Sequence, residues 1–125
     1  MIVKTGRELI LNDVYTKMSA GDWYVKIGTG TDIVMESDSD LINAIKTNGT
    51  TDLQMPLSTT NCTKDSANNA IKIELTISNT ATVTNQIITE FGIFTDENKL
   101  FSRVIQEPVV IGPSSSETLT YYLYL

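Results

Sequence analysis

The stretch that decides the fold is AIKIELTIS, residues Ala70–Ser78. Isoleucine or leucine occupies every second position from 71 to 77, and charged or hydroxyl side chains fill the positions between them. Because successive side chains of a β-strand point to opposite faces, this alternation predicts a strand with one face in the core and one in water. Strands of that kind are typical of antiparallel sheets.

Shorter segments on both sides of this strand have similar β-rich patterns and are separated by turn residues. They are residues 23–27, 53–57, 87–94, 100–105, 108–113 and 118–125. Thr95–Lys99 has the composition of a hairpin turn, Asn48-Gly49 marks another turn, and Pro56 favours an edge position. Many short strands of this kind predict a mainly β protein, a single antiparallel β-sandwich domain over residues 1–125. We expect residues 108–113 to form a separate short strand between two prolines.

One helix is expected at the N-terminal end, over about residues 6–18. Thr5 and Glu8 have the spacing of a capping box, in which a threonine caps the helix and a glutamate three residues later bonds back. Apolar residues follow at helical spacing, and Gly21 lies just past the expected end. We expect this helix to pack across an edge or an end of the sandwich.

Composition narrows the class of protein. The chain has 125 residues, a net charge of −6 and a pI of about 4.4, so an acidic surface would repel a phosphate backbone and nucleic acid is not an expected partner. No apolar run approaches the roughly 18 residues of a membrane span, so we expect no membrane partner. The N-terminal sequence MIVKTGRELI carries charges where a secretory signal would be apolar, so no signal peptide is expected.

The sequence offers few groups for catalysis. It contains no histidine and one cysteine, which removes the commonest general base, the usual zinc ligand and any disulfide within the chain. We interpret Cys62 as a small buried residue, since a catalytic thiol needs a base. Glu74 and Glu90 are both expected on solvent-facing sides of strands. The sequence therefore predicts a protein that is not an enzyme and needs no cofactor or metal.

A glycine motif and a group of acids follow the first strand, in KIGTGTDIVMESDSD, residues 26–40. The motif lacks the Lys-Ser/Thr of a phosphate-binding loop and the third glycine of a dinucleotide fingerprint, so it predicts a glycine turn that leaves a strand. Asp38 and Asp40 resemble the start of a calcium loop, but the other ligands are missing, and a solvated acidic loop at residues 32–40 is favoured. Residues 41–45 are ambiguous, because Asp38 or Ser39 could cap a helical turn there.

The candidate interface residues are Arg7 and four aromatics: Trp23, Tyr24, Tyr122 and Tyr124. Exposed aromatic side chains can anchor a protein interface or stack on sugars. Tyr121 would face the core, and Tyr122 and Tyr124 would face outward or into a partner. The last strand is apolar or aromatic on both faces, so it is covered either by a second subunit or, if it is a central strand, by the helix.

Three pieces of the sequence appear in an order that resembles a family of small structural proteins of tailed bacteriophages. The first is the helix with Gly6-Arg7 near its start. The second is Ile27-Gly-Thr-Gly-Thr31, followed by an acidic loop and Asp40-Leu-Ile-Asn43. The third is Ile88-Thr-Glu-Phe-Gly-Ile-Phe94, a hairpin, and Leu100-Phe-Ser-Arg103. The middle of the chain, about residues 49–69, carries no such signature, and Ile33–Glu36 and Phe101-Ser102 depart from the family pattern.

The resemblance implies a virion component made in the host cytoplasm. We expect a capsid decoration protein that binds the assembled shell, commonly as a homo-oligomer, with phage structural proteins as partners. A tail or baseplate fibre-type component is the alternative within virions. A small carbohydrate-binding module is the alternative from another class.

Overall fold

The computed structural model describes residues 1–47 and 50–125. It is a mainly β protein with one helix, arranged as an antiparallel β-sandwich. The elements are α1 (Lys4–Ser19), β1 (Tyr24–Gly28), β2 (Lys46–Thr47), β3 (Thr51–Asp52), β4 (Met55–Pro56), β5 (Cys62–Asp65), β6 (Ala70–Ser78), β7 (Gln86–Phe94), β8 (Leu100–Ile111) and β9 (Ser116–Tyr124). The predicted turn at Asn48-Gly49 lies outside the described residues.

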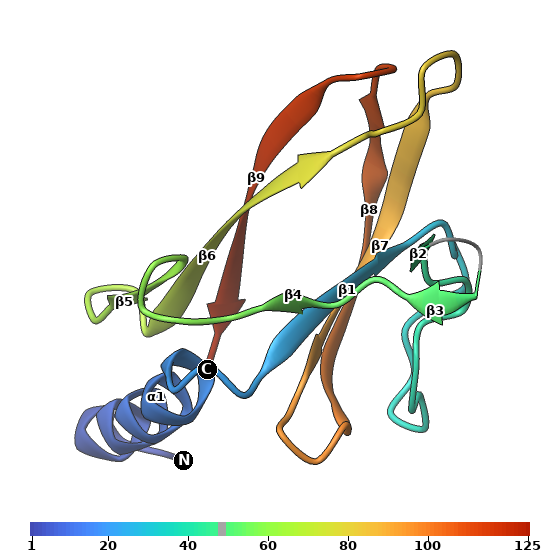
Figure 1. Cartoon of the computed structure of the whole chain (residues 1–125). Helices are drawn as coiled ribbons and strands as arrows, with labels where there is room; N and C mark the ends of the chain where they lie inside the picture. The colour runs from blue at the N-terminus through green and yellow to red at the C-terminus, as the bar shows by residue number, and fades with distance from the viewer. Residues whose placement is uncertain (48–49) are drawn as a thin grey trace.

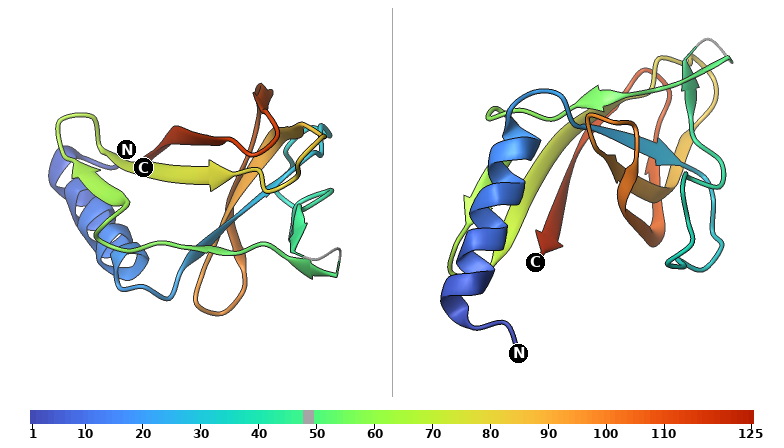
Figure 2. Two further views of the ribbon diagram at one scale, coloured as in Figure 1. Left: turned by 45° about the horizontal axis from the view of Figure 1, so that its top comes forward. Right: turned by 90° about the horizontal axis from the view of Figure 1, so that it is seen from below.

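The larger sheet has the order β4-β1-β7-β8, and the second sheet has the order β5-β6-β9. A short ribbon of β2 and β3 lies at the opposite end of the molecule from α1, which packs beside β5 and β6 (Figures 1 and 2). The prediction that the helix packs at an edge is confirmed, since β5 is an edge strand. Pro56 also lies in an edge strand, β4, as expected.

The core lies between the two sheets. Ile71 and Ile73 of β6 are fully buried, while Glu74 and Thr76 on the same strand are exposed, as the alternation predicts. The opposite side of the core comes from β1 and β7, and α1 closes one end. Its main members are Leu11, Met18, Val25, Ile27, Leu57, Ile71, Ile73, Leu75, Ile77, Ile88, Phe91 and Ile93.

The helix begins earlier than the capping box predicts, and that prediction is wrong. The N-cap is Val3, which makes no side-chain cap hydrogen bond. Arg7 donates its N–H to the Val3 carbonyl, so Thr5 already lies inside the first turn. At the other end Gly21 has φ +102°, a left-handed conformation that suits glycine and stops the helix where expected. No helix in the described part of the chain is both long and apolar enough to span a bilayer.

One further prediction is corrected, and the structure resolves the segment at residues 41–45 that the sequence left ambiguous. Residues 108–113 do not form a separate strand, because β8 continues through Pro108 as far as Ile111. The proline is accommodated beside a β-bulge, where the pairing of β8 with β7 shifts its register between Ile88 and Glu90. Residues 41–45 form no helical turn. The chain bends at Ile42 and Asn43 instead, and Ala44 is bridged to Gly28 of β1.

Candidate functional site

The segment after β1 folds back over the outer face of the larger sheet. Thr29 donates its N–H to the Asn43 carbonyl at 3.0 Å, and Ile45 donates to the Ile27 carbonyl at 2.8 Å. We call residues 29–44 the covering loop. It buries a second apolar cluster, Tyr24, Leu41 and Phe94, on the side of the sheet that would otherwise meet water.

Glu90 lies beneath the covering loop and is fully buried, so its prediction as a solvent-facing carboxylate is wrong. Its carboxylate accepts the backbone N–H groups of Gly30 at 3.1 Å, Ile42 at 3.1 Å and Asn43 at 2.8 Å. Arg103 of β8 adds two contacts to Oε2, from Nε at 3.2 Å and Nη2 at 3.1 Å. A buried carboxylate with this many donors is compensated for the water it has lost.

Arg103 extends this network to the acidic part of the loop. Its side chain is 1% exposed, and its Nη1 donates to Asp38 at 3.0 Å while Nη2 donates to the Asp32 carbonyl at 3.1 Å. Thr89 donates its hydroxyl to the Gly30 carbonyl at 3.0 Å. The two ends of the covering loop are therefore tied to one ion pair on the sheet.

The glycines of the GTG motif are explained by close approach to Glu90. A Cβ added at Gly28 would lie 2.5 Å from Glu90 Oε1, and one at Gly30 would lie 2.6 Å from the same atom. The Gly30 N–H that a phosphate would need is donated to Glu90. The motif is thus the turn by which the chain leaves β1, and it packs directly on the Glu90 carboxylate. That carboxylate occupies the space that a bound phosphate would need.

Lys26 holds the other side of the covering loop. Its Nζ lies 2.8 Å from Asp52, 3.5 Å from Asp40 and 4.6 Å from the centre of the Phe94 ring. Burial alone would lower the pKa of Lys26, but the hydrogen bond to Asp52 and the charges of Asp40 and Asp52 raise it overall. Hydrogen bonds from Lys26 and Lys46 lower the pKa of Asp52.

These charged groups do not resemble a reaction centre. Glu90, Arg103, Asp38, Lys26 and Asp52 are each paired with an opposite charge from the same chain. Within residues 1–47 and 50–125, no group of three or more His, Cys, Asp or Glu side chains is placed to hold a metal ion. The role of the network is therefore structural, since it fixes the covering loop to the sheet.

Cys62 is buried, as expected for a small core residue. Burial raises the pKa of its thiol to about 11, although a hydrogen bond from the Ser58 backbone acts in the opposite direction. A thiol with that pKa is a poor nucleophile at neutral pH, because the thiolate is the reactive form.

The five candidate interface residues lie in three different places. Tyr122 and Tyr124 are exposed on the outer face of β9, 47% and 68% respectively, with ring centres 6.2 Å apart. Arg7 is exposed on α1, beside an open hollow next to the turn between β5 and β6. Trp23 and Tyr24 lie in the interior, 5% and 9% exposed.

The packing of Trp23 and Tyr24 within the chain explains why both rings are buried. Trp23 joins the main core and lies against Phe101, with ring centres 5.1 Å apart. Tyr24 stacks on Phe94, with centres 5.3 Å apart, and donates its hydroxyl to Asn98 at 2.9 Å. The interface prediction therefore stays open only for Arg7, Tyr122 and Tyr124.

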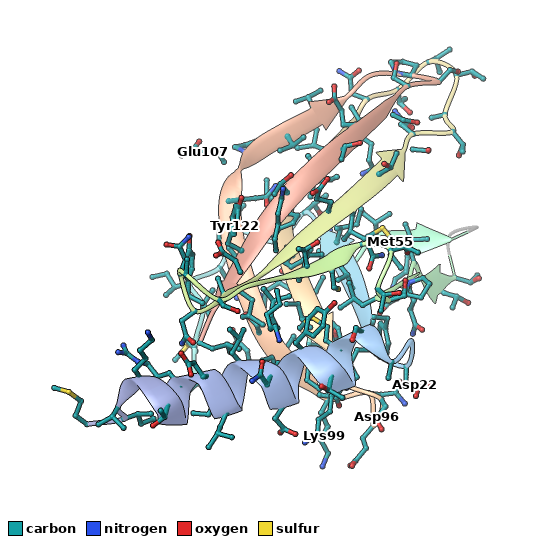
Figure 3. The ribbon with its side chains drawn as sticks, turned by 90° about the vertical axis from the view of Figure 1, so that its left-hand side faces the viewer. Asp22, Met55, Asp96, Lys99, Glu107 and Tyr122 are labelled. Atoms are coloured by element: carbon teal, nitrogen blue, oxygen red, sulfur yellow. The ribbon has the colours of Figure 1, made fainter. Side chains whose placement is uncertain are left out.

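A hollow of about 460 Å³ lies beside the C-terminal end of α1. Asp22, Asp96 and Lys99 gather around it in Figure 3, while Tyr122 lies on the other side of the molecule. Its charged lining is of mixed sign and comes from the last turn of α1 and from two exposed loops. This hollow has the character of open surface between a helix end and a hairpin.

The outer edge of β9 lies at one side of the second sheet. β9 pairs with β6 along its whole length and, among the described strands, with no other on its far side. Between β8 and β9 lies a narrow apolar hollow of about 80 Å³, lined in part by Val104, Tyr122 and Leu123. The rival prediction that the last strand is central and covered by the helix is wrong, because α1 lies beside β5 and β6.

No family model matches this sequence, and neither the curated proteins nor the solved structures include a match to it.

Sequence reasoning missed the buried network centred on Glu90. The alternation along β7 assigns Glu90 to the face opposite Phe91, which is correct, but it cannot tell that the covering loop lies over that face. Two signals were present. Two glycines stand two residues apart directly after a strand, and an isolated arginine stands in the strand that pairs with the one containing Glu90.

Proposed function

We propose that this chain is a structural protein of a bacteriophage particle, and within that class a capsid decoration protein that binds the assembled shell. One observation supports it most. The GTGT, ITE and arginine segments that resemble the phage family meet at a single buried contact among Gly30, Glu90 and Arg103. The three segments lie on or beside the neighbouring strands β1, β7 and β8, so they form one structural unit in this fold.

The arrangement of the molecule suits a protein that works by attachment. The ion pairs Lys26–Asp40 and Arg103–Asp38 hold the covering loop against the sheet, and this stiffens one half of the sandwich. The edge of β9 is left free, together with the exposed rings of Tyr122 and Tyr124. A rigid module with one free strand edge can add that strand to a partner through main-chain hydrogen bonds.

The carbohydrate-binding alternative is weaker in this fold. A sugar platform built from four aromatic side chains needs Trp23 and Tyr24 at the surface, and both are buried. Only Tyr122 and Tyr124 remain exposed, and their rings are inclined at 25° on one strand. A tail or baseplate location would use the same β9 surface, so the experiment has to separate the two virion locations.

Immunogold labelling of purified particles tests the proposal. An antibody raised against the recombinant chain should decorate phage heads on particles from the source of the sequence. Label confined to tails would replace decoration by the tail or baseplate alternative. Particles without label, in a preparation where the major shell protein is labelled by its own antibody, would refute a virion role. A glycan array on the same recombinant protein should show no binding.

A further inference from the structure

The direction of the backbone groups on β9 follows from two hydrogen bonds at its ends. Leu125 donates its N–H to the Asn69 carbonyl at 3.0 Å, and Asn79 donates to the Ser115 carbonyl at 2.8 Å. Neighbouring residues of a strand point their backbone groups to opposite edges. The odd-numbered residues of β9 therefore face β6. The even-numbered residues present free N–H and C=O groups at the outer edge: Ser116, Thr118, Thr120, Tyr122 and Tyr124.

The other edges of the two larger sheets are each protected against pairing, whereas β9 is not. β4 has two residues and includes Pro56, and β5 has four residues with α1 beside it. β8 contains Pro108 and the irregular pairing with β7. Short length, proline, bulges and a covering helix are the usual devices that prevent edge-to-edge contact. β9 has nine residues, no proline, no lysine and one charge, Glu117.

We propose that the occupant of this edge is a second copy of β9, which pairs antiparallel across a two-fold axis at Thr120. This register pairs all nine residues of the strand. Thr120 lies opposite itself, Thr118 opposite Tyr122, and Ser116 opposite Tyr124. The result is a continuous six-stranded sheet, β5-β6-β9 joined to its two-fold copy.

The chemistry of the strand makes this register self-complementary. Glu117 lies opposite Leu123 of the other copy, so no like charges face each other. Threonine–threonine and threonine–aromatic pairs across strands are favourable, and the outer tyrosines of the two copies lie on the same face, one pair at each end of the joined strands. On the inner face Leu119 and Tyr121, which are only partly buried in one copy, lie opposite each other. A two-fold contact of identical surfaces is the commonest form of protein oligomer.

This inference stands on the edge of β9 and goes beyond the proposed function, since it needs no particle. Light scattering after size exclusion should find the purified chain as a dimer, twice the 13.8 kDa of one copy. A monomer at every concentration tested would overturn the inference and leave the virion proposal untouched. Conversely, a dimer that labels no particle would refute only the proposed function.

Two charge variants test the position of the axis. Thr120→Lys and Thr120→Glu each place a charge directly opposite its own copy, so each alone should be a monomer, with the dissociation constant of the dimer raised about tenfold or more. An equimolar mixture should recover the dimer, because lysine then faces glutamate. The matched controls are Thr76→Lys and Thr76→Glu, on the same outer face but one strand away from the edge.

The outcomes are decisive in each case. Dimers in both Thr120 variants, or a mixture that stays monomeric, would rule out a two-fold axis at Thr120. Thr120→Lys lies across from Glu74 of its own chain, so it should fold even if Thr120→Glu, which meets the same carboxylate, does not. If Thr120→Glu does not fold, the oligomeric state of Thr120→Lys tests the position of the axis, and Thr120→Pro is the second variant. Proline removes one outward N–H from the edge of β9, so Thr120→Pro should also be a monomer.

Discussion

At the scale of single residues, Glu90 shows how a charge can be the centre of a fold. It receives three backbone N–H groups and Arg103, and all of these donors come from segments far away in the sequence. The covering loop contributes few buried apolar side chains, with Leu41 as its main one. Its position over the sheet therefore depends on the carboxylate more than on hydrophobic burial.

Replacing Glu90 by Gln should destabilise the protein strongly. The substitution leaves the buried Arg103 with Asp38 as its remaining carboxylate partner, and breaking a buried ion pair in this way costs about 3–5 kcal/mol. Chemical denaturation measures the change in the free energy of unfolding. The control is Glu74→Gln on the exposed face of β6, where a surface change should stay within about 0.5 kcal/mol. Equal effects of the two substitutions would contradict the role given to Glu90.

Gly30 should not tolerate even a methyl group. Its Cβ would lie 2.6 Å from Glu90 Oε1 and 2.7 Å from Ile42 Cβ, and overpacking of this kind costs about 1–3 kcal/mol. Gly112→Ala is the matched control, because its new Cβ would lie 3.7 Å from its nearest neighbour, Ser115 Oγ. Thermal unfolding should give a lower Tm for Gly30→Ala and little change for Gly112→Ala. An unchanged Tm for Gly30→Ala would show that the loop does not press on Glu90.

At the scale of elements, the strands could be predicted where one face is buried and the other is wet. The strand at residues 70–78 was located to the residue because Lys72, Glu74 and Thr76 mark its wet face. β1 and β7 are buried on both faces, and there the alternation assigns faces correctly without showing what covers each one. Pro108 misled the prediction of β8 for another reason, since a bulge tolerates a proline that a regular ladder would reject.

The contact of β3 with β1 and β2 should weaken in acid through Asp52. Hydrogen bonds from Lys26 and Lys46 lower the pKa of Asp52 in the folded state, so its contribution to stability is present above the ordinary aspartate value of 3.8. That contribution is lost as the pH falls through the lowered, folded-state pKa. Unfolding free energies measured from neutral pH downward should therefore decline less steeply in Asp52→Asn than in the natural chain. The control is Asp96→Asn, in the exposed turn between β7 and β8. Its unfolding free energy should fall with pH as steeply as that of the natural chain.

At the scale of the whole molecule, the sandwich and its terminal helix could be predicted from periodicity, but the position of β9 at the edge of its sheet could not. The sequence of β9 shows a strand without a wet face, and two arrangements satisfied that pattern. It could be a central strand under the helix or an edge strand awaiting a partner. The structure places it at an edge, since α1 lies beside β5 and β6 instead. The virion role stays a prediction that rests on the resemblance of the motifs.

The most direct test of the account is amide hydrogen exchange along β9, read residue by residue by NMR at high and at low protein concentration. In the dimer the amides of Thr118, Thr120 and Tyr122 should be protected, and on dilution they should exchange rapidly. The amides of Leu119, Tyr121 and Leu123 should stay protected throughout, because they bond to β6 in the single copy. Outer amides that exchange rapidly at every concentration, or that stay protected at every concentration, would contradict an edge that closes by pairing with its own copy.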